Sequence, residues 1–355
     1  MAIWRISGAK FMRLMYWLQI SKWYVVLLLF SLLLNGCHAS TGKEDQVELL
    51  NVSYDVMRDF YKAYNPLFIR HFQLENNHAQ LIIKQSNGGS SKQALAVANG
   101  LQADVVSMNQ ISDIDLLVQK KLVQPSWSQQ LPNNSVPFSS VVVFLVRKNN
   151  PKQIHDWADL IRPDVQIVSS NPKTSGNGRY ALLAAYGYAL QNSNGDKFAA
   201  RKYVEKLFHQ VVILASGSRA ASNTFVQRQI GDVLLVFENE ASMVAKDLWP
   251  NQFEVIYPSY SIQADSPVAV IETTTSRKQT TVIAQSYLRY LWSDEGQNLA
   301  AQFYLRPSNL QVAKCYAERF PEIRTFRAEE VLGNWTVIMQ EFFADGGIFD
   351  QIYRQ

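Results

Sequence analysis

Val47-Glu48-Leu49-Leu50-Asn51-Val52 is the first stretch whose pattern decides the fold, because this short and mainly apolar run predicts a β-strand. It continues through Ser53-Tyr54-Asp55 into a segment with apolar residues at helical spacing, which predicts a helix over residues 55–72. Pro66 lies inside that segment, and we expect it to break or kink the helix. A strand that passes through a polar turn into a helix is the repeating unit of an α/β fold.

The same unit recurs along the chain and divides it into two parts. In the first part, residues 47–138, further strands are predicted at 81–83 and 104–108 and further helices at 90–99 and 112–121. In the second part, residues 139–258, strands are predicted at 141–146, 165–168, 211–214 and 233–237, and helices at 157–161, 178–190, 198–208 and 221–230. The helix at 178–190 is expected to be strongly amphipathic, since its apolar residues recur at helical spacing.

Residues 259–355 are interpreted as a return to the first part followed by C-terminal helices. The strands at 253–257 and 267–271 are taken as that return, and helices are predicted at 280–292 and 295–304. The chain is therefore predicted to form two α/β lobes, each a mostly parallel sheet flanked by helices. Two crossover strands join the lobes into a hinged clamshell that holds its ligand between them.

The N-terminal residues indicate export. Four basic residues and no acidic one precede a short apolar run over residues 25–34, which ends at Leu34-Asn35-Gly36-Cys37. Residues 1–37 are interpreted as a signal peptide with a lipobox-like cleavage site, Cys37 as the acylated first residue and residues 38–46 as a polar tether. An ordinary signal peptide cleaved near Ala39 and an uncleaved anchor are the alternatives, and each of them also exports the chain.

Charge and cysteine content exclude several classes of protein. The chain carries 34 basic and 30 acidic residues, and its net charge of +4 comes from the leader. The remainder is neutral, so no nucleic-acid-binding surface is indicated. The second cysteine, Cys315, is expected to be a small buried hydrophobic residue. No cysteine or histidine pair has metal-ligand spacing, and we expect no metal and no cofactor.

Four short polar turns, each predicted between a strand and a helix, are the candidate binding elements. They are Ser53-Tyr54-Asp55, Gly88-Gly89-Ser90-Ser91, Thr174-Ser175-Gly176-Asn177-Gly178 and Ser216-Gly217-Ser218-Arg219. The carboxyl ends of parallel strands are where open α/β folds bind ligands. A helix start presents unpaired N–H groups and partial positive charge, so several of them together would bind an anion without Lys or Arg. The alternative is that each is an ordinary helix cap.

In these stretches the chain resembles the periplasmic sulfate- and thiosulfate-binding proteins of ABC uptake systems, which are type II periplasmic binding proteins. The resemblance extends from Leu49 to about Tyr353. Its motifs are Leu50-Asn51-Val52-Ser53-Tyr54-Asp55, Gln85-Ser86-Asn87-Gly88-Gly89-Ser90, Leu131-Pro132-Asn133-Asn134-Ser135, Val143-Phe144-Leu145-Val146-Arg147-Lys148, Asn171-Pro172-Lys173-Thr174-Ser175-Gly176, Thr224-Phe225-Val226-Gln227-Arg228, Gly231-Asp232-Val233-Leu234, Glu238-Asn239-Glu240 and Phe343-Ala344-Asp345-Gly346-Gly347.

The resemblance implies a set of uncharged donors around a dehydrated dianion. The implied donors are the backbone N–H of Asp55, Ser90, Gly176, Asn177 and Ser218 and the hydroxyl of Ser175. Sulfate binders carry an indole N–H where this chain has Phe237, whereas the thiosulfate branch carries Phe there. Asn177 and Asn87 also depart from the usual Gly and His. Sulfate and thiosulfate are therefore both kept as ligands: Phe237 favours thiosulfate, and the rest of the pattern favours sulfate.

The resemblance further implies a monomeric, extracytoplasmic binding protein that delivers its ligand to the permease of an ABC importer and is not an enzyme. A molybdate binder, and a sensor or adhesin that keeps the fold without transport, remain alternatives. An enzyme with a phosphate-like site is the alternative from another class. It would need a general base near the turns, and His155 and His209 are expected to be surface residues instead.

Overall fold

The computed structural model describes residues 47–76 and 80–353, and its first sheet has the order β10-β3-β1-β2. The three strands β1 (Val47–Tyr54), β2 (Leu81–Gly88) and β3 (Val105–Ser107) are parallel, and β10 (Val268–Val270) joins them antiparallel. We call this sheet and its helices lobe one. The helices are η1 (Asp55–Met57), α2 (Arg58–Glu75), α3 (Ser90–Ala98), α4 (Ile111–Gln119), α10 (Glu272–Lys278), α11 (Thr281–Arg289), η5 (Tyr290–Trp292) and α12 (Asp294–Gln302).

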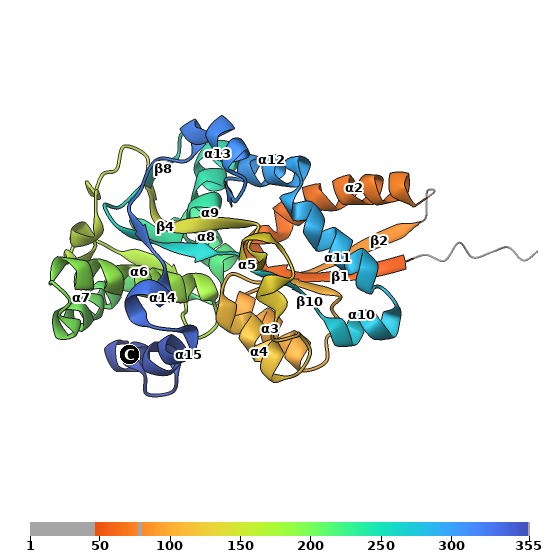
Figure 1. The fold of residues 1–355 in the computed structure, drawn as a ribbon. Helices are drawn as coiled ribbons and strands as arrows, with labels where there is room; N and C mark the ends of the chain where they lie inside the picture. The colour runs from red at the N-terminus through yellow and green to blue at the C-terminus, as the bar shows by residue number, and fades with distance from the viewer. Residues whose placement is uncertain (1–46, 77–79, 354–355) are drawn as a thin grey trace, which may run out of the picture. The chain divides into compact units, whose positions relative to one another are not determined.

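Both faces of the first sheet are covered, as a mostly parallel sheet requires. In Figure 1, α2 and α11 lie on one side of β1 and β2, and α3 and α4 lie on the other. Between α2 and α11, buried aromatic rings pack edge to face, for example Tyr64 against Tyr287 at 5.2 Å between ring centroids. Such contacts contribute roughly 0.5–1.5 kcal/mol each beyond the burial of area.

Pro66 was expected to break or kink the first helix, and a break is excluded because α2 continues through it from Arg58 to Glu75. One face of α2 is fully buried, with Phe60, Tyr64 and Phe68 in the core. Burial of each large side chain contributes about 1.5–3 kcal/mol. Together they outweigh the roughly 3 kcal/mol that a proline inside a helix costs.

The second sheet has the order β12-β9-β4-β7-β5-β6, with β8 and β11 also paired to β4. Its strands are β4 (Phe138–Arg147), β5 (Ile167–Ser170), β6 (Val211–Ala215), β7 (Val233–Phe237), β8 (Phe253–Ile256), β9 (Ser261–Asp265), β11 (Arg306–Pro307) and β12 (Thr325–Phe326). We call this sheet and the helices packed on it lobe two. These helices include η3 (Trp157–Ile161), α6 (Gly176–Asn192), α7 (Lys197–His209), α8 (Ser218–Val226), α9 (Glu238–Ser242) and η4 (Met243–Leu248).

Shorter elements connect the lobes and close the chain. They are η2 (Trp127–Gln129), α5 (Pro132–Ser135), α13 (Leu310–Cys315), η6 (Ala317–Arg319), α14 (Ala328–Leu332), α15 (Trp335–Ile338), η7 (Met339–Phe343) and α16 (Ile348–Ile352). The C-terminal helices pack against lobe two (Figure 1). There Phe342 contacts Tyr186 and Phe349 contacts Phe208. The strand β10 and helices α10 to α12 lie in lobe one.

The two segments that cross between the lobes pair with each other. β4 and β9 are antiparallel, and Ser139 lies opposite Asp265. The chain passes from lobe one into β4 and returns from β9 to β10, so this pair of strands forms the connection. The expectation that the strand near 253–257 is part of the return is wrong. β8 pairs with β4 inside lobe two, and the return begins only after β9.

The helix α6 is central rather than amphipathic, contrary to the sequence-based expectation. It extends from Gly176 to Asn192, and nearly all of its residues up to Ala185 are buried on every side. β5 and β7 lie on one side of it, and the C-terminal segment with Trp335 and Phe342 lies on another. A helix that is covered all round is the pattern of a buried core element.

The expectation that Cys315 is buried is also wrong, since it is a free thiol on the surface at the end of α13. The predicted leader, the tether and Cys37 lie outside the described residues. Along residues 47–76 and 80–353, no helix combines the length and apolar character needed to span a bilayer.

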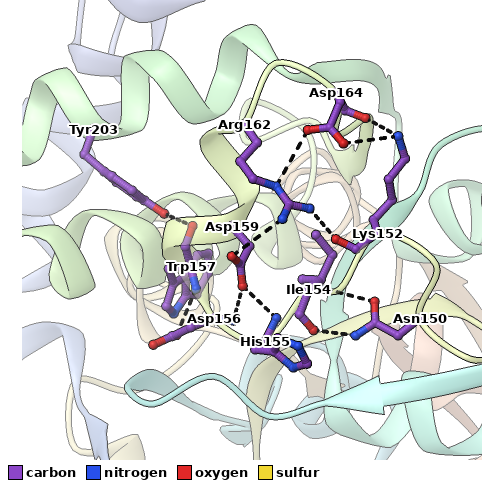
Figure 2. Close-up of polar contacts among 10 residues, drawn as sticks. All are labelled: Asn150, Lys152, Ile154, His155, Asp156, Trp157, Asp159, Arg162, Asp164 and Tyr203. Carbon is purple, nitrogen blue, oxygen red and sulfur yellow. Dashed lines mark hydrogen bonds and ion pairs between the residues drawn. The ribbon is translucent and has the colours of Figure 1, made fainter.

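A network of polar contacts fixes the irregular loop that follows β4 in lobe two (Figure 2). The carboxylate of Asp159 accepts from the N–H of His155 at 2.8 Å and of Asp156 at 3.1 Å, which caps η3. The Tyr203 hydroxyl donates to the carbonyl of Trp157 at 2.6 Å and ties α7 to the same helix. The conformation of the loop is therefore fixed by hydrogen bonds to Asp159 within it and to Tyr203 of α7.

Candidate functional site

The four predicted turns meet where the two lobes face each other. A Cβ added to Gly89 of lobe one would lie only 2.7 Å from the carbonyl oxygen of Thr174 in lobe two. A Cβ on Gly217 would lie 2.9 Å from a carboxylate oxygen of Asp55. Both distances are below normal van der Waals contact, so a glycine is required at each of these approaches between the lobes. Gly89 approaches the backbone of the opposite lobe, and Gly217 approaches the side chain of Asp55.

A fifth turn, which the sequence analysis did not identify, joins the same region. Asn109 follows β3 and is buried, and its side-chain oxygen lies 2.0 Å from where a Cβ on Gly176 would be. Its place after a parallel strand and before α4 is the same place in the pattern that the four turns occupy. That position is the signal that could have identified it.

The helices that start at these turns have no side-chain caps. Tyr54, Gly89, Ser175 and Gly217 precede η1, α3, α6 and α8, and none of them makes a capping hydrogen bond with its side chain. Within residues 47–76 and 80–353, no acceptor binds the backbone N–H of Ser90, Gly176, Asn177 or Ser218. The helix starts thus bring unpaired donors and partial positive charge to one place.

Of the three serines predicted in the site, only Ser175 has a hydroxyl that is available. The Ser90 hydroxyl accepts the N–H of Asn109 at 3.1 Å. The Ser218 hydroxyl donates to the carboxylate of Glu240 and accepts from the side-chain amide of Asn177. Ser175 is 2% exposed, and its hydroxyl makes no hydrogen bond within the described part of the chain. Its hydroxyl is therefore the side-chain donor left for a ligand.

The carboxylate of Asp55 bridges the lobes instead of facing an anion. It accepts from the N–H of Val56 in its own helix and from the N–H of Arg219 in lobe two, both at 3.1 Å. Burial raises the pKa of Asp55, whereas the N–H and the charge of Arg219 lower it. The negative charge of Asp55 is thus directed to α8, and its own backbone N–H remains at the first turn.

The cationic side chains beside the lobe-two turns are bound elsewhere. Arg219 pairs with Asp59 of α2 at 2.9 Å between nitrogen and carboxylate oxygen. The Lys173 ammonium donates to Asp350 at 2.9 Å and to the carbonyl of Phe343 at 2.9 Å. A ligand between the lobes would therefore meet backbone dipoles before it meets a formal positive charge.

Glu240 holds the starts of α6 and α8 in register. It accepts from the hydroxyls of Ser218 and Ser222, and the Ser218 hydroxyl accepts in turn from the amide of Asn177. Burial, followed by the charge of Asp55, raises the pKa of Glu240 to about 7. The sequence analysis quoted Glu240 only as part of a motif, because nothing local to it indicates that it connects two helix starts.

Phe237, the last predicted site residue, ends β7 and precedes α9. It is 1% exposed, and its ring contacts that of Tyr180 edge to face with 5.7 Å between centroids. The ring offers no hydrogen-bond donor. A buried apolar ring therefore occupies the position where the resemblance implies an indole N–H in sulfate binders.

Two α/β lobes joined by paired crossover strands, with unpaired helix starts meeting between them, define the class of the two-lobed periplasmic binding proteins. The chain belongs to the family of bacterial extracellular solute-binding proteins, whose model matches residues 55–306. It is not an enzyme family, and the predicted two-lobed fold is confirmed.

Within this family, the chain is similar to proteins that are named for the anions they bind. It is 51% identical over 324 residues to the thiosulfate-binding protein of Pseudomonas aeruginosa, covering 91% of this chain and 97% of that protein. It is 46% identical over 317 residues to the sulfate-binding protein of Escherichia coli, covering 89% of this chain and 96% of that protein. The solved structure of the sulfate-binding protein of Mycobacterium tuberculosis matches with a TM-score of 0.75 and 29% identity, covering 84% of this chain and 100% of that one.

Proposed function

We propose that the protein captures sulfate or thiosulfate as a dehydrated dianion between its lobes and delivers it to the permease of an ABC importer. The amides of Asp55, Ser90, Gly176, Asn177 and Ser218 and the hydroxyl of Ser175 would surround the anion. The observation that carries the proposal is the convergence of uncapped helix starts from both lobes with their amides unpaired.

Two observations bear on which dianion is bound. The relatives include both a thiosulfate-binding and a sulfate-binding protein at similar identity. Phe237 provides an apolar ring in place of a donor, which suits the larger and softer terminal sulfur of thiosulfate. A sulfate oxygen at that position would lose a hydrogen bond of about 1.5–3 kcal/mol, so we rank thiosulfate first at this residue.

A cage made of donors should reject an oxyanion that still carries a proton. Phosphate usually keeps one at neutral pH, and that proton would find no acceptor among the amides, which leaves a buried donor unpaired. We expect phosphate to bind roughly a thousandfold more weakly than the preferred dianion. Comparable affinities in calorimetric titrations would contradict the cage.

The test combines a ligand series with one substitution. Sulfate, thiosulfate, molybdate and phosphate are titrated calorimetrically into the wild-type protein and into Ser175→Ala. Loss of a charge-assisted hydrogen bond should weaken the preferred ligand about ten- to a hundredfold. Ser126→Ala changes an exposed serine in lobe one and should have no effect. An unaltered affinity in Ser175→Ala would exclude the hydroxyl from the site.

We further propose that the protein is a monomer held at the outer face of a bacterial membrane by acylation of Cys37. The lipobox-like residues before Cys37 support this, and an ordinary cleaved leader is the alternative. Metabolic labelling with a radioactive fatty acid distinguishes them. Label is expected in the wild-type protein and not in Cys37→Ala. An unlabelled wild-type protein would exclude acylation and leave a cleaved, unlipidated chain or an uncleaved anchor.

A further inference from the structure

A cavity of about 450 Å³, separate from the proposed anion site, lies between the lobes behind the first turns of α3 and α6. Helices α3 and α4 of lobe one form one side, and α6 with the C-terminal segment α15–η7 forms the other. Its lining residues Ser91 and Arg179 come just after the candidate anion donors Ser90 and Gly176–Asn177 in the chain. The cavity is therefore separate from the anion site but shares two helix starts with it.

The cavity contains a buried carboxylate that is incompletely paired. Asp113 is 4% exposed, and one of its oxygens lies 3.8 Å from a guanidinium nitrogen of Arg179. Its other oxygen has no hydrogen-bond partner within residues 47–76 and 80–353. A buried charge without a full partner is strongly unfavourable, so the cavity requires a donor at this oxygen.

Arg179 cannot neutralise the cavity alone. Its guanidinium also donates to the carbonyl of Pro172 at 2.9 Å and to the hydroxyl of Ser91 at 2.7 Å. A second carboxylate, Asp115, lines the same cavity. One cation faces two carboxylates, which leaves the lining net negative and disfavours an anionic occupant.

The remaining walls are apolar and aromatic. Trp335 and Phe343 line the cavity, and the indole N–H of Trp335 donates to Glu329, which fixes the orientation of its ring. Leu95 and Leu116 contribute aliphatic surface. A carboxylate among aromatic and aliphatic side chains is the chemistry that recognises an organic ammonium group. The described residues contain no cluster of three metal-ligating side chains, so a bare metal ion fits less well.

We propose that this cavity binds a small organic monocation, an ammonium group on an aromatic or aliphatic body, with Asp113 as its ion-pair partner. The ammonium donates to the unpaired oxygen of Asp113, and the apolar body packs on Trp335 and Leu116. Because the walls come from both lobes, the ligand contacts both of them in the closed arrangement. It therefore stabilises closure, and its binding is coupled to that of any ligand between the lobes.

The test uses 2-phenylethylammonium as the probe and 2-phenylethanol as its neutral counterpart, both titrated calorimetrically into the whole protein. We expect saturable binding of the ammonium, and we expect the alcohol to bind at least about tenfold more weakly than the ammonium. Asp113→Asn should weaken the ammonium about tenfold or more, while Asp164→Asn, an exposed carboxylate in Figure 2, should leave it unchanged. Equal binding of the two probes by the wild-type protein overturns the proposal even if Asp113→Asn fails to fold.

A second measurement tests the coupling through closure. Saturating thiosulfate should tighten binding of the ammonium, and the ammonium should tighten binding of thiosulfate by the same factor. An ammonium affinity that does not change when the oxyanion is bound would show that the probe does not bridge the lobes. If thiosulfate itself does not bind, the proposed function fails while the probe titration still decides the cavity.

Discussion

At the level of one side chain, Phe237 is the residue that we propose sets the balance between the two candidate dianions. It ends β7 beside the first residues of α9, and its buried ring packs on Tyr180. The other members of the proposed cage are backbone amides and the Ser175 hydroxyl, which cannot distinguish an oxygen from a sulfur by charge alone. The one apolar contact in the proposed cage is therefore where the two ligands differ most.

Replacing Phe237 with Trp should raise sulfate affinity and lower the ratio of thiosulfate to sulfate affinity. An indole N–H that reaches the anion would add a charge-assisted hydrogen bond, worth roughly ten- to a hundredfold in affinity. Calorimetric titration of both anions into Phe237→Trp measures the ratio. Phe237→Leu has no donor and serves as the control. If sulfate binds no better to the Trp variant, the ring lies outside the ligand contacts.

At the level of elements, the strand-turn-helix order could be predicted because it depends on local pattern. Helical structure begins at Asp55 and at Ser90, as predicted, and α6 begins at Gly176, two residues before the predicted start at Gly178. Local pattern does not show what a helix packs against. For this reason α6 was expected to have an exposed face, although the C-terminal helices, more than 140 residues later in the chain, cover it.

The same limit explains the other corrections. Pro66 was expected to break α2 because the cost of a proline is local, while the burial that offsets it depends on lobe one as a whole. β8 pairs with β4, and strand pairing at a separation of about 100 residues has no signal in a single sequence. Cysteine is usually a buried residue type, but Cys315 lies exposed at the end of the short helix α13.

Site residues followed a similar rule. Those whose backbone serves the proposed site, such as Ser90 and Gly176, were identified because a helix start is visible in the sequence. Glu240 and Arg219 act through side chains that reach across the fold to Ser218 and Asp59. Ser218 is 22 residues from Glu240 and Asp59 is 160 residues from Arg219, so only the three-dimensional structure shows that both charged side chains already have partners and are not free for a ligand.

At the level of the whole molecule, the structure is in a closed arrangement. The lobes are joined by a backbone contact between Gly89 and Thr174 and by an approach of Gly217 to the Asp55 carboxylate. The Arg219–Asp59 ion pair adds to these contacts. Gly89 has φ −54° and ψ 134°, which any residue adopts. Glycine is needed at this position for the approach of the opposite lobe rather than for its backbone conformation.

Gly89→Ala should therefore impair closure without impairing folding. The added methyl would lie 2.7 Å from the carbonyl oxygen of Thr174 only when the lobes are closed. Relief of that overlap should cost about 1–3 kcal/mol, so ligand affinity should fall roughly five- to a hundredfold while the melting temperature without ligand stays the same. Calorimetry with thiosulfate and thermal unfolding of the free protein measure the two quantities.

Gly88→Ala is the matched control for this variant. Its added methyl meets only the flexible side chain of Gln93 in lobe one, at 3.0 Å, so closure is not obstructed and affinity should be close to that of the wild-type protein. A Gly89→Ala protein that binds as tightly as Gly88→Ala would mean that the ligand is held without contact between these turns. Capture between closing lobes would then be excluded, because a ligand can shift the protein toward closure only through the contacts that it makes in the closed state.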